Sequence, residues 1–597
     1  MLHTMKRNVY LIVSLLNTVL LLLSGCRLNT DILGISGNQS TSPLIINNSF
    51  TSLKMGSSID LNISGGLPPY NYQVLSGAAT IDLNGRLQVG WSHSDLEVKV
   101  TDSIGEEFYV TVPVEGGSIH LTPLNPSGLQ NYSLPIICSN TKKIYFMGEL
   151  ETVGVVELFE SDFNGDNLRK INSPLVTGGN VYNAQLTPDC QGLFYIADQV
   201  IDNVNDVFSV DLNGGSPINL TNLTSGTLNF MDYSPTLNKM AVVGNNDGTF
   251  KSELFTVTFG VTSSLSIVSD TLAADFPGIT EARFLADDTT IMFSGTQFSA
   301  SEKHVHTQSL TAPAGISQIS NNGTGAWTFL MPQEIGSSGN IVYGSLPSGS
   351  CKLYGGLAET AGSVNLLSTN INFESTFCND FVGLSDGSQV FYPASNSSAS
   401  TKAIYMSSTS AQGSTMITPS YPSASTLFSK LKLSSDESTI YFTARLPSVT
   451  GIQLYKVDIA TGVVTVLSLV EDVRPDFQLS PDESKIIFKS NAPSTYDLYV
   501  TNTDGTGTPL KLSPTNDVTN FSVLTSKVIF MMKANPGDPY ELYSIDFDGN
   551  NMKKISRTVV AGGNVLTFSV SQDEQSIFYG GDLEVDGRYE IYFTSAE

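Results

Sequence analysis

The sequence predicts an all-β protein, in which a small β-sandwich precedes a β-propeller of about ten four-stranded repeats. An apolar triplet such as Ile440-Tyr441-Phe442 occurs ten times between residues 144 and 579, at intervals of about 48 residues. Repeats of 40 to 50 residues with four short strands each are typical of propeller blades. Charged residues make up only 14% of the chain, Asn-Gly and Asp-Gly turns are frequent, and no long amphipathic helix pattern follows the N-terminal segment.

The N-terminal segment has the layout of a secretory signal. Lys6 and Arg7 precede an apolar run from Val9 to Leu23 that is too short to span a bilayer. The run ends in Leu23-Ser24-Gly25-Cys26, which resembles the bacterial lipobox. That resemblance implies a signal peptide at 1–25 and a lipid-modified Cys26. The following Arg27 favours the outer membrane; the alternative is an ordinary signal peptide with a nearby cysteine.

Two segments separate this anchor from the repeats. Residues 26–42 are polar and predict a flexible tether. Residues 43–116 contain short alternating strands, with Asn84-Gly85 as a hairpin turn. The sequence GGLPPYNYQV in this segment, followed by VKVTDSIGEEFYVTV, resembles Ig-like or cadherin-like modules of bacterial surface proteins. The resemblance implies a β-sandwich that acts as a spacer or an adhesive unit.

Residues 117–597 contain the repeats, and residues 477–512 show their layout most clearly. LSPDESKIIFKS with YDLYVTNTDG resembles the repeat of the TolB-type propeller, and LSSDESTIYFTA with IQLYKVDIATG repeats the pattern. The resemblance implies a propeller with protein partners in the cell envelope, because TolB binds a peptidoglycan-associated lipoprotein and a colicin segment. This chain departs from that family in its lipid anchor, its Ig-like module and its larger number of repeats.

The last repeat lacks a fourth strand, since the chain ends soon after its third strand at 589–593. Residues 118–122 have the form of the missing strand, and we expect them to close the ring. Closure would remove two exposed sheet edges. Ten repeats exceed the usual four to eight blades, so the sequence leaves open one wide ring or two lobes.

Four cysteines remain beside Cys26, an even number that suggests two disulfides in an exported protein. Cys138 and Cys190 fall in neighbouring repeats, as do Cys351 and Cys378, so we expect each pair to join two blades. Each bridge would stabilise the fold by about 3–4 kcal/mol. The alternative is four buried free thiols.

No residue emerges as catalytic, and no cofactor or metal is predicted. His304 and His306 are weak candidates for metal ligands, but the expected arrangement is a solvated strand face. Ser385 lies in a Gly-x-Ser-x-Gly pattern, but at the position of a turn and with no histidine after His306. Asp-rich turns that are similar to calcium loops lack the required ligand spacing and are interpreted as hairpin turns, at 162–166, 211–214 and 546–550.

These observations favour a non-enzymatic protein-binding or scaffolding lipoprotein of the cell envelope, held to the bilayer through Cys26. Its partners would be envelope or surface proteins, and the sequence does not predict an oligomeric state. The net charge of -26 argues against nucleic acid as a partner. A cell-surface adhesin is the alternative, and a glycan-active hydrolase or lyase is less favoured because histidines are few.

Overall fold

The computed structural model describes residues 42–596 apart from a set of short gaps. The gaps are 51, 91–94, 115–118, 122–134, 248–250, 270–277, 280, 296–303, 312–314, 321–332, 337–338, 346–350, 359, 361–363, 370, 374–379, 397, 424–426, 448, 450, 469–471, 493–494 and 515–516. The described residues form two compact units, the first ending at Val114 and the second continuing to the C-terminal end. The described part contains no helix that is long and apolar enough to cross a membrane.

The first unit is built from two three-stranded antiparallel sheets and a separate strand pair. One sheet has the order β2 (Ser58–Asp60), β6 (Arg86–Val89), β5 (Ala79–Ile81), and the other has the order β4 (Asn71–Ser76), β7 (Leu96–Thr101), β8 (Glu107–Val112). The pair joins β1 (Ile45–Ile46) to β3 (Ile63–Ser64). Alternate residues of β7 are buried, including Val98 and Val100, so this strand contributes one face to the core. The Ig-like assignment stays a prediction.

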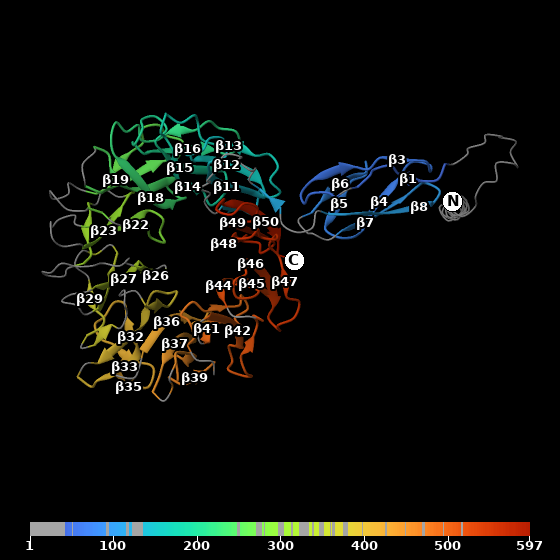
Figure 1. Ribbon diagram of the computed structural model, residues 1–597. Helices are drawn as coiled ribbons and strands as arrows, with labels where there is room; N and C mark the ends of the chain where they lie inside the picture. Colours follow the sequence, from blue (N-terminus) through green and yellow to red (C-terminus); the bar gives the residue numbers. More distant parts are fainter. Residues whose placement is uncertain are drawn as a thin grey trace, which may run out of the picture. The chain divides into compact units, whose positions relative to one another are not determined.

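The second unit contains ten sheets, which we number as blades one to ten in chain order, all with antiparallel pairing (Figure 1). Blades one to three comprise β10 (Ile136–Cys138), β11 (Lys143–Gly148), β12 (Glu157–Asp162), β13 (Arg169–Lys170); β14 (Val181–Leu186), β15 (Gly192–Ala197), β16 (Asp206–Asp211), β17 (Ile218–Asn219); and β18 (Thr227–Ser234), β19 (Lys239–Asn245), β20 (Glu253–Thr258), β21 (Ser266–Ile267). Blades four and five comprise β22 (Glu281–Phe284), β23 (Thr290–Gly295), β24 (His304–Ser309), β25 (Ser317–Gln318); and β26 (Gln333–Ile335), β27 (Asn340–Ser345), β28 (Lys352–Leu357), β29 (Asn365–Leu366).

Blade six has extra short pairings and comprises β30 (Asn372–Phe373), β31 (Val382–Gly383), β32 (Gln389–Asn396), β33 (Thr401–Ser408), β34 (Thr415–Met416) and β35 (Tyr421–Pro422). Blades seven and eight comprise β36 (Leu427–Leu433), β37 (Thr439–Arg445), β38 (Gln453–Asp458), β39 (Val464–Val466); and β40 (Gln478–Leu479), β41 (Lys485–Ala492), β42 (Thr495–Asn502), β43 (Leu510–Lys511). Blades nine and ten comprise β44 (Val518–Val523), β45 (Lys527–Lys533), β46 (Tyr540–Asp546), β47 (Lys553–Lys554); and β48 (Val565–Val570), β49 (Ser576–Gly581), β50 (Glu590–Ser595), β9 (Ile119–His120).

The all-β propeller predicted from the sequence is confirmed, since each apolar triplet lies in the second strand of a blade. These strands are almost wholly buried, because their side chains pack between neighbouring blades. In blade eight, for example, Ile486 and Phe488 pack against Tyr441 and Leu454 of blade seven. The innermost strands, such as β14, β18, β44 and β48, lie nearest the centre of the ring in Figure 1.

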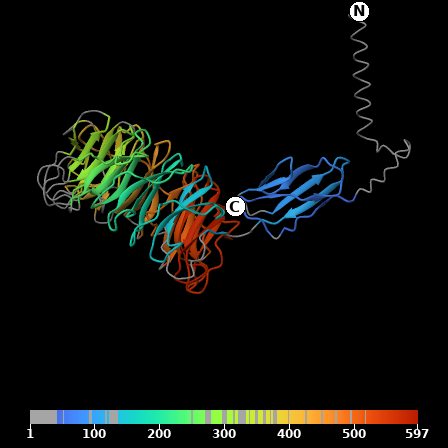
Figure 2. The same ribbon diagram turned by 90° about the horizontal axis from the view of Figure 1, so that it is seen from above.

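The ten blades form one ring, because the last packs on the first. Phe163 of blade one contacts Phe578 of blade ten edge to face, with 4.7 Å between ring centroids. Lys142 forms an ion pair with Asp573 across the same interface. Figures 1 and 2 both show the red strands of blade ten beside the cyan strands of blade one. The two-lobe alternative is therefore excluded.

The strand that completes blade ten comes from the N-terminal side of the ring. In blade ten, β9 pairs with β50, and Ile119 lies opposite Phe593. The next residue, Leu121, is 3% exposed, and its N–H donates to the carbonyl of Ile591 at 2.9 Å. The last four-stranded sheet is thus made from both ends of the ring, and β9 covers the edge of β50 that would otherwise be unpaired.

A polar side chain two residues after the end of the outermost strand is repeated in blades one to nine. Its oxygen accepts from a backbone N–H of the third strand at 2.8–3.1 Å, as in the bond from Leu498 N–H to Ser513. The acceptors are Asn172, Thr221, Ser269, Ser320, Ser368, Thr418, Ser468, Ser513 and Ser556. A buried N–H without a partner is costly, which explains why a short polar residue recurs there.

A second repeated feature joins neighbouring blades. In the turn between the first two strands, a glutamate with positive φ accepts from a backbone N–H in the equivalent turn of the preceding blade. Ser435 N–H lies 3.0 Å from both carboxylate oxygens of Glu483, and Thr525 N–H lies 2.8 Å from Glu574. Ser385 N–H donates to Glu437 in the same way. We call this contact the inter-blade clasp.

Candidate binding surface on the innermost strands

Five innermost strands contain a β-bulge at a similar place. In each, one residue has no partner on the second strand, and the register shifts around it. A bulge re-aims a side chain and increases local twist, and bulges are frequent next to functional sites. The bulged residues are Tyr182, Met231, Lys430, Thr519 and Leu566.

The bulged residues differ in chemistry and are largely accessible. Tyr182 is 47% exposed and Leu566 is 55% exposed. Lys430 and Thr519 are also exposed, and Met231 is half-buried. The inner surface of the ring therefore presents a different side chain in each of these five blades.

Hydrogen bonds hold two of these bulges in place. The Tyr182 hydroxyl donates to the Asp198 carboxylate at 3.0 Å, and burial together with this contact raises the pKa of Tyr182. The Lys489 ammonium of blade eight donates to the carbonyl of Thr519 in the bulge of blade nine at 2.7 Å. Lys489 also pairs with Asp476 at 2.7 Å. The bulges are thus supported parts of the fold.

A cavity of about 260 Å³ lies beside the bulge of blade three, lined by residues of blades three and four. The Asp232 carboxylate accepts from the backbone N–H of Phe284 at 2.7 Å and so ties the two innermost strands together. Arg283 also lines the cavity, and its burial lowers the pKa of its guanidinium. The carboxylates of Asp232, Glu281 and Glu334 act on that pKa in the opposite direction.

The structure places the candidate metal ligands His304 and His306 in the protein interior, so our expectation of a solvated strand face was wrong. They are 6% and 0% exposed. The His304 Nδ1 lies 3.0 Å from the hydroxyl of Ser320. His306 stacks on Phe293 with 5.2 Å between ring centroids, and burial lowers its pKa to about 3. His306 occupies the position at which most other third strands have Phe or Tyr, and sequence spacing alone did not show this.

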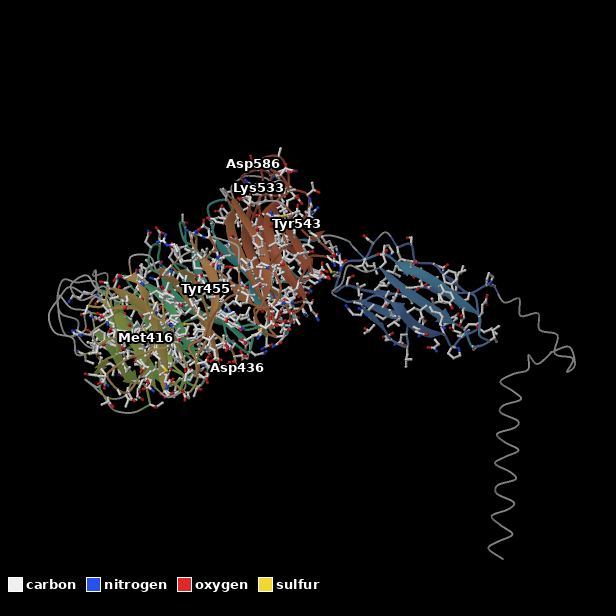
Figure 3. All side chains as sticks on the ribbon, turned by 90° about the horizontal axis from the view of Figure 1, so that it is seen from below. Met416, Asp436, Tyr455, Lys533, Tyr543 and Asp586 are labelled. Carbon is white, nitrogen blue, oxygen red and sulfur yellow. A yellow bond between two sulfur atoms is a disulfide. The ribbon has the colours of Figure 1, made fainter. Side chains whose placement is uncertain are left out.

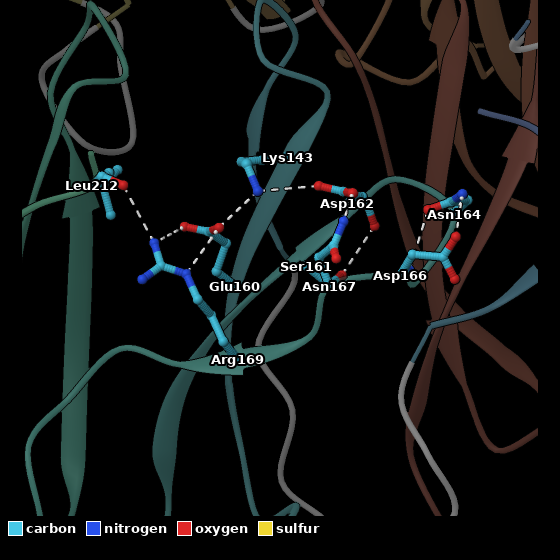
Figure 4. Close-up of polar contacts among 9 residues, drawn as sticks. All are labelled: Lys143, Glu160, Ser161, Asp162, Asn164, Asp166, Asn167, Arg169 and Leu212. Carbon is cyan, nitrogen blue, oxygen red and sulfur yellow. Dashed lines mark hydrogen bonds and ion pairs between the residues drawn. The ribbon is translucent and has the colours of Figure 1, made fainter. Parts of the chain in front are cut away.

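The described residues contain no group of three or more His, Cys, Asp or Glu side chains placed to hold a metal ion. The Asp-rich turn at 162–166 has protein partners for its carboxylates (Figure 4). Asp162 accepts from Lys143 at 3.1 Å and from Asn167 at 2.6 Å, and Asp166 accepts from Asn164 at 2.9 Å. These bonds are the ones that a hairpin turn requires.

Ser385 lies in the turn between β31 and β32, and its N–H forms an inter-blade clasp with Glu437. A nucleophile elbow would instead place the serine between a strand and a helix. The pattern around Ser385 is therefore a turn between two strands.

The cysteine predictions have different outcomes. Cys138 and Cys190 form a disulfide, with 6.2 Å between their Cα atoms, and it joins blades one and two as predicted. Cys351 is disulfide-bonded, but Cys378, its expected partner, lies outside the described residues. Cys26, the expected lipidation site, also lies outside them.

The bulges were not predicted from the sequence, although the sequence contains a residue pattern that indicates three of them. In three of the five strands an Asn or Asp directly follows the bulged residue, and its side chain accepts from the next backbone N–H. The acceptors are Asn183, Asp232 and Asn520, at 2.8–2.9 Å. Such local bonds compete with strand pairing, so an Asn or Asp inside an innermost strand indicates a bulge.

No protein-family model matches the chain, and no curated protein matches it. Structural similarity is found to a putative TolB from Agrobacterium tumefaciens, with 16% identity and a TM-score of 0.26, covering 47% of this chain and 93% of that one. An oligogalacturonate lyase in complex with manganese has 10% identity and a TM-score of 0.32, covering 65% and 95%. A eukaryotic initiation factor has 10% identity and a TM-score of 0.38, covering 67% and 94%. Likeness at this level carries no argument about function, and the fold assignment rests on the sheets themselves.

Proposed function

We propose that the chain is a lipid-anchored, non-enzymatic binding protein of the bacterial cell envelope, and that the innermost strands of the ring form its binding surface. The observation that supports this most directly is the set of bulges that presents Tyr182, Met231, Lys430, Thr519 and Leu566. A rigid ring that presents a different side chain at each of these bulged positions is well suited to specific binding.

The anchor belongs to the same proposal. Lipid on Cys26 would hold the chain at the outer membrane, and residues 26–42 would form the tether. Several acyl chains give stable attachment, whereas a single chain does not. Labelling cells with radioactive palmitate tests this: we expect label on the wild-type chain and none on a Cys26→Ala variant. Label on both would contradict the anchor.

The binding surface is tested by capture of partners from the organism's own envelope. A Tyr182→Ala/Leu566→Ala variant removes the two large exposed apolar side chains of the innermost strands. The matched control, Ile267→Ala/Val463→Ala, removes side chains that are 54% and 58% exposed away from these strands. We expect quantitative mass spectrometry to show at least one partner that is captured by the wild type and the control but lost from the first variant.

Equal capture by all three proteins would contradict a binding role for the innermost strands. Protease treatment of intact cells separates the two locations that the proposal allows. A chain facing the periplasm stays uncut, and a chain displayed on the cell surface, as an adhesin would be, is cut.

A further inference from the structure

The cavity between blades three and four combines charged and apolar groups in a small volume. Glu281 and Arg283 of β22 and Asp232 of β18 supply the charges, and the half-buried Met231 supplies apolar surface. Met292 and Phe293 also line the cavity but are each only 1% exposed. Its volume of about 260 Å³ is roughly nine times the share of one water molecule in the liquid. That size suits one ring-shaped group better than a long chain segment.

Arg283 has donors that the protein does not use. Its Nη2 is buried and has no hydrogen-bond partner among the residues that the structure describes. A guanidinium carries five N–H donors and stays charged in proteins, and a buried charge without hydrogen bonds is unfavourable. Because Arg283 also lines the cavity, an acceptor that enters it meets a guanidinium whose hydrogen bonds are not completed by the described residues.

The surrounding charges decide which acceptor fits. Asp232 and Glu281 line the cavity together with Arg283, so an anionic ligand would meet two carboxylates for one guanidinium. A cationic ligand such as an ammonium group would be attracted by the carboxylates but would offer no acceptor to the Arg283 donors. A neutral hydroxyl group avoids both penalties, because its oxygen accepts from Arg283 while its hydrogen is donated to a carboxylate.

We infer that this cavity binds a sugar residue of a neutral glycan, with Arg283 and Glu281 bonded to its hydroxyl groups. The half-buried Met231 side chain then contacts the C–H face of the ring, where its flexible thioether adapts to the shape of the ring. The inference rests on the proposed function, because it names a ligand class for one part of the same inner surface.

Isothermal titration calorimetry on the full-length purified protein tests the inference. The probes are maltotriose, cellotriose and chitotriose as neutral glycans, trigalacturonate as an anionic glycan, and acetyl-trialanine amide as a neutral peptide. We expect at least one neutral glycan to bind, and we expect Arg283→Met to weaken that binding at least tenfold. Met231→Trp, which fills the cavity and leaves its charges unchanged, should have a similar effect.

The control is Arg474→Met, which removes an exposed guanidinium that stacks on Tyr496 in blade eight, with 5.2 Å to the ring centroid. It should bind the glycan like the wild type, and thermal melts of all variants should show that they are folded. Failure of every neutral glycan to bind would overturn the inference. So would tighter Arg283-dependent binding of the anionic glycan or of the peptide.

Envelope capture by Arg283→Met separates this inference from the proposed function. If no glycan binds but partners are still captured in a manner that depends on Tyr182 and Leu566, only the glycan inference fails. Release of new reducing ends from a bound glycan would instead overturn the non-enzymatic part of the proposed function.

Discussion

The disulfide between blades one and two takes the place of an inter-blade clasp. Cys190 occupies the turn position that Glu483 has in blade eight, and the two residues share a positive φ of 58° and 54°. Glu483 holds the N–H of Ser435 in the preceding blade. Cys190 instead forms a disulfide with Cys138 of the preceding blade. Ser139, the residue after Cys138, has the turn position in blade one that Ser435 has in blade seven. One position thus joins neighbouring blades by two different chemistries.

This equivalence gives a quantitative prediction. The disulfide closes a loop of 52 residues, for which the chain-entropy relation gives about 4 kcal/mol of stabilisation. A Cys138→Ser/Cys190→Ser variant should lose up to that free energy of unfolding. A Cys138→Ser/Cys190→Glu variant should regain about 1 kcal/mol, because the new carboxylate can accept from the Ser139 N–H.

Urea unfolding followed by circular dichroism measures these differences. The matched control is Cys138→Ser/Cys190→Gln, whose side chain has the same size as glutamate without its charge, and which should regain less than the glutamate variant. Two results would refute the reasoning. One is a serine variant as stable as the oxidised wild type. The other is a glutamate variant no more stable than the serine variant, in a protein where Glu483→Gln is destabilising.

Three further predictions concern the ring. Deleting residues 117–123 removes the strand that completes blade ten and should abolish cooperative unfolding in calorimetry; an unchanged melt would contradict closure by this strand. Ser513→Ala leaves the buried N–H of Leu498 without its acceptor and should lower the free energy of unfolding by about 1–3 kcal/mol, whereas Ser526→Ala, at an exposed turn position, should have no effect in the same urea titration. Burial lowers the pKa of His306 to about 3 in the folded state, whereas its pKa in the unfolded chain is about 6.5. The stability contributed by the neutral side chain is therefore fully present above pH 6.5 and is lost as the pH falls towards 3. His306→Phe should therefore gain stability relative to the wild type by up to about 1.4 kcal/mol per pH unit below pH 6, and an equal pH dependence of the two proteins would contradict a buried neutral histidine.

The repeated part of the fold could be predicted because it depends on burial. A strand that packs between two blades is apolar on both faces, so its triplet appears in the sequence without alternation. The Cys138–Cys190 pairing followed from the same repeats, because equivalent turn positions in neighbouring blades lie close together. The clasp partners Ser435 and Glu483 are also one repeat apart, with a separation of 48 residues. A glutamate in a turn has no distinctive sequence pattern, however, so the clasp could not be predicted.

The position of the two histidines could not be predicted. Alternation placed His304 and His306 on one side of a strand, but both sides of a third strand are covered by neighbouring blades. Whether a strand face meets solvent is decided by tertiary packing, and a short polar segment does not carry this information. The repeat alignment is the better guide, since it assigns His306 to a position that other blades fill with buried aromatic rings.

The distribution of repeated and variable features supports the proposed binding surface on the innermost strands. The polar acceptor that follows the outermost strand is present in nine blades, as a hydroxyl in eight and as the Asn172 amide in blade one, and the inter-blade clasps lie in the turns between the first two strands. Figure 3 shows that Asp436, in one such turn, and Lys533, at the far end of a second strand, lie on opposite sides of the ring. The closure of the ring explains these repeated contacts, because neighbouring blades must be held together. It does not explain why, in the described part of the chain, bulges occur in five of the innermost strands, each presenting a different side chain. Differences that the fold does not require are expected where the protein recognises something outside itself.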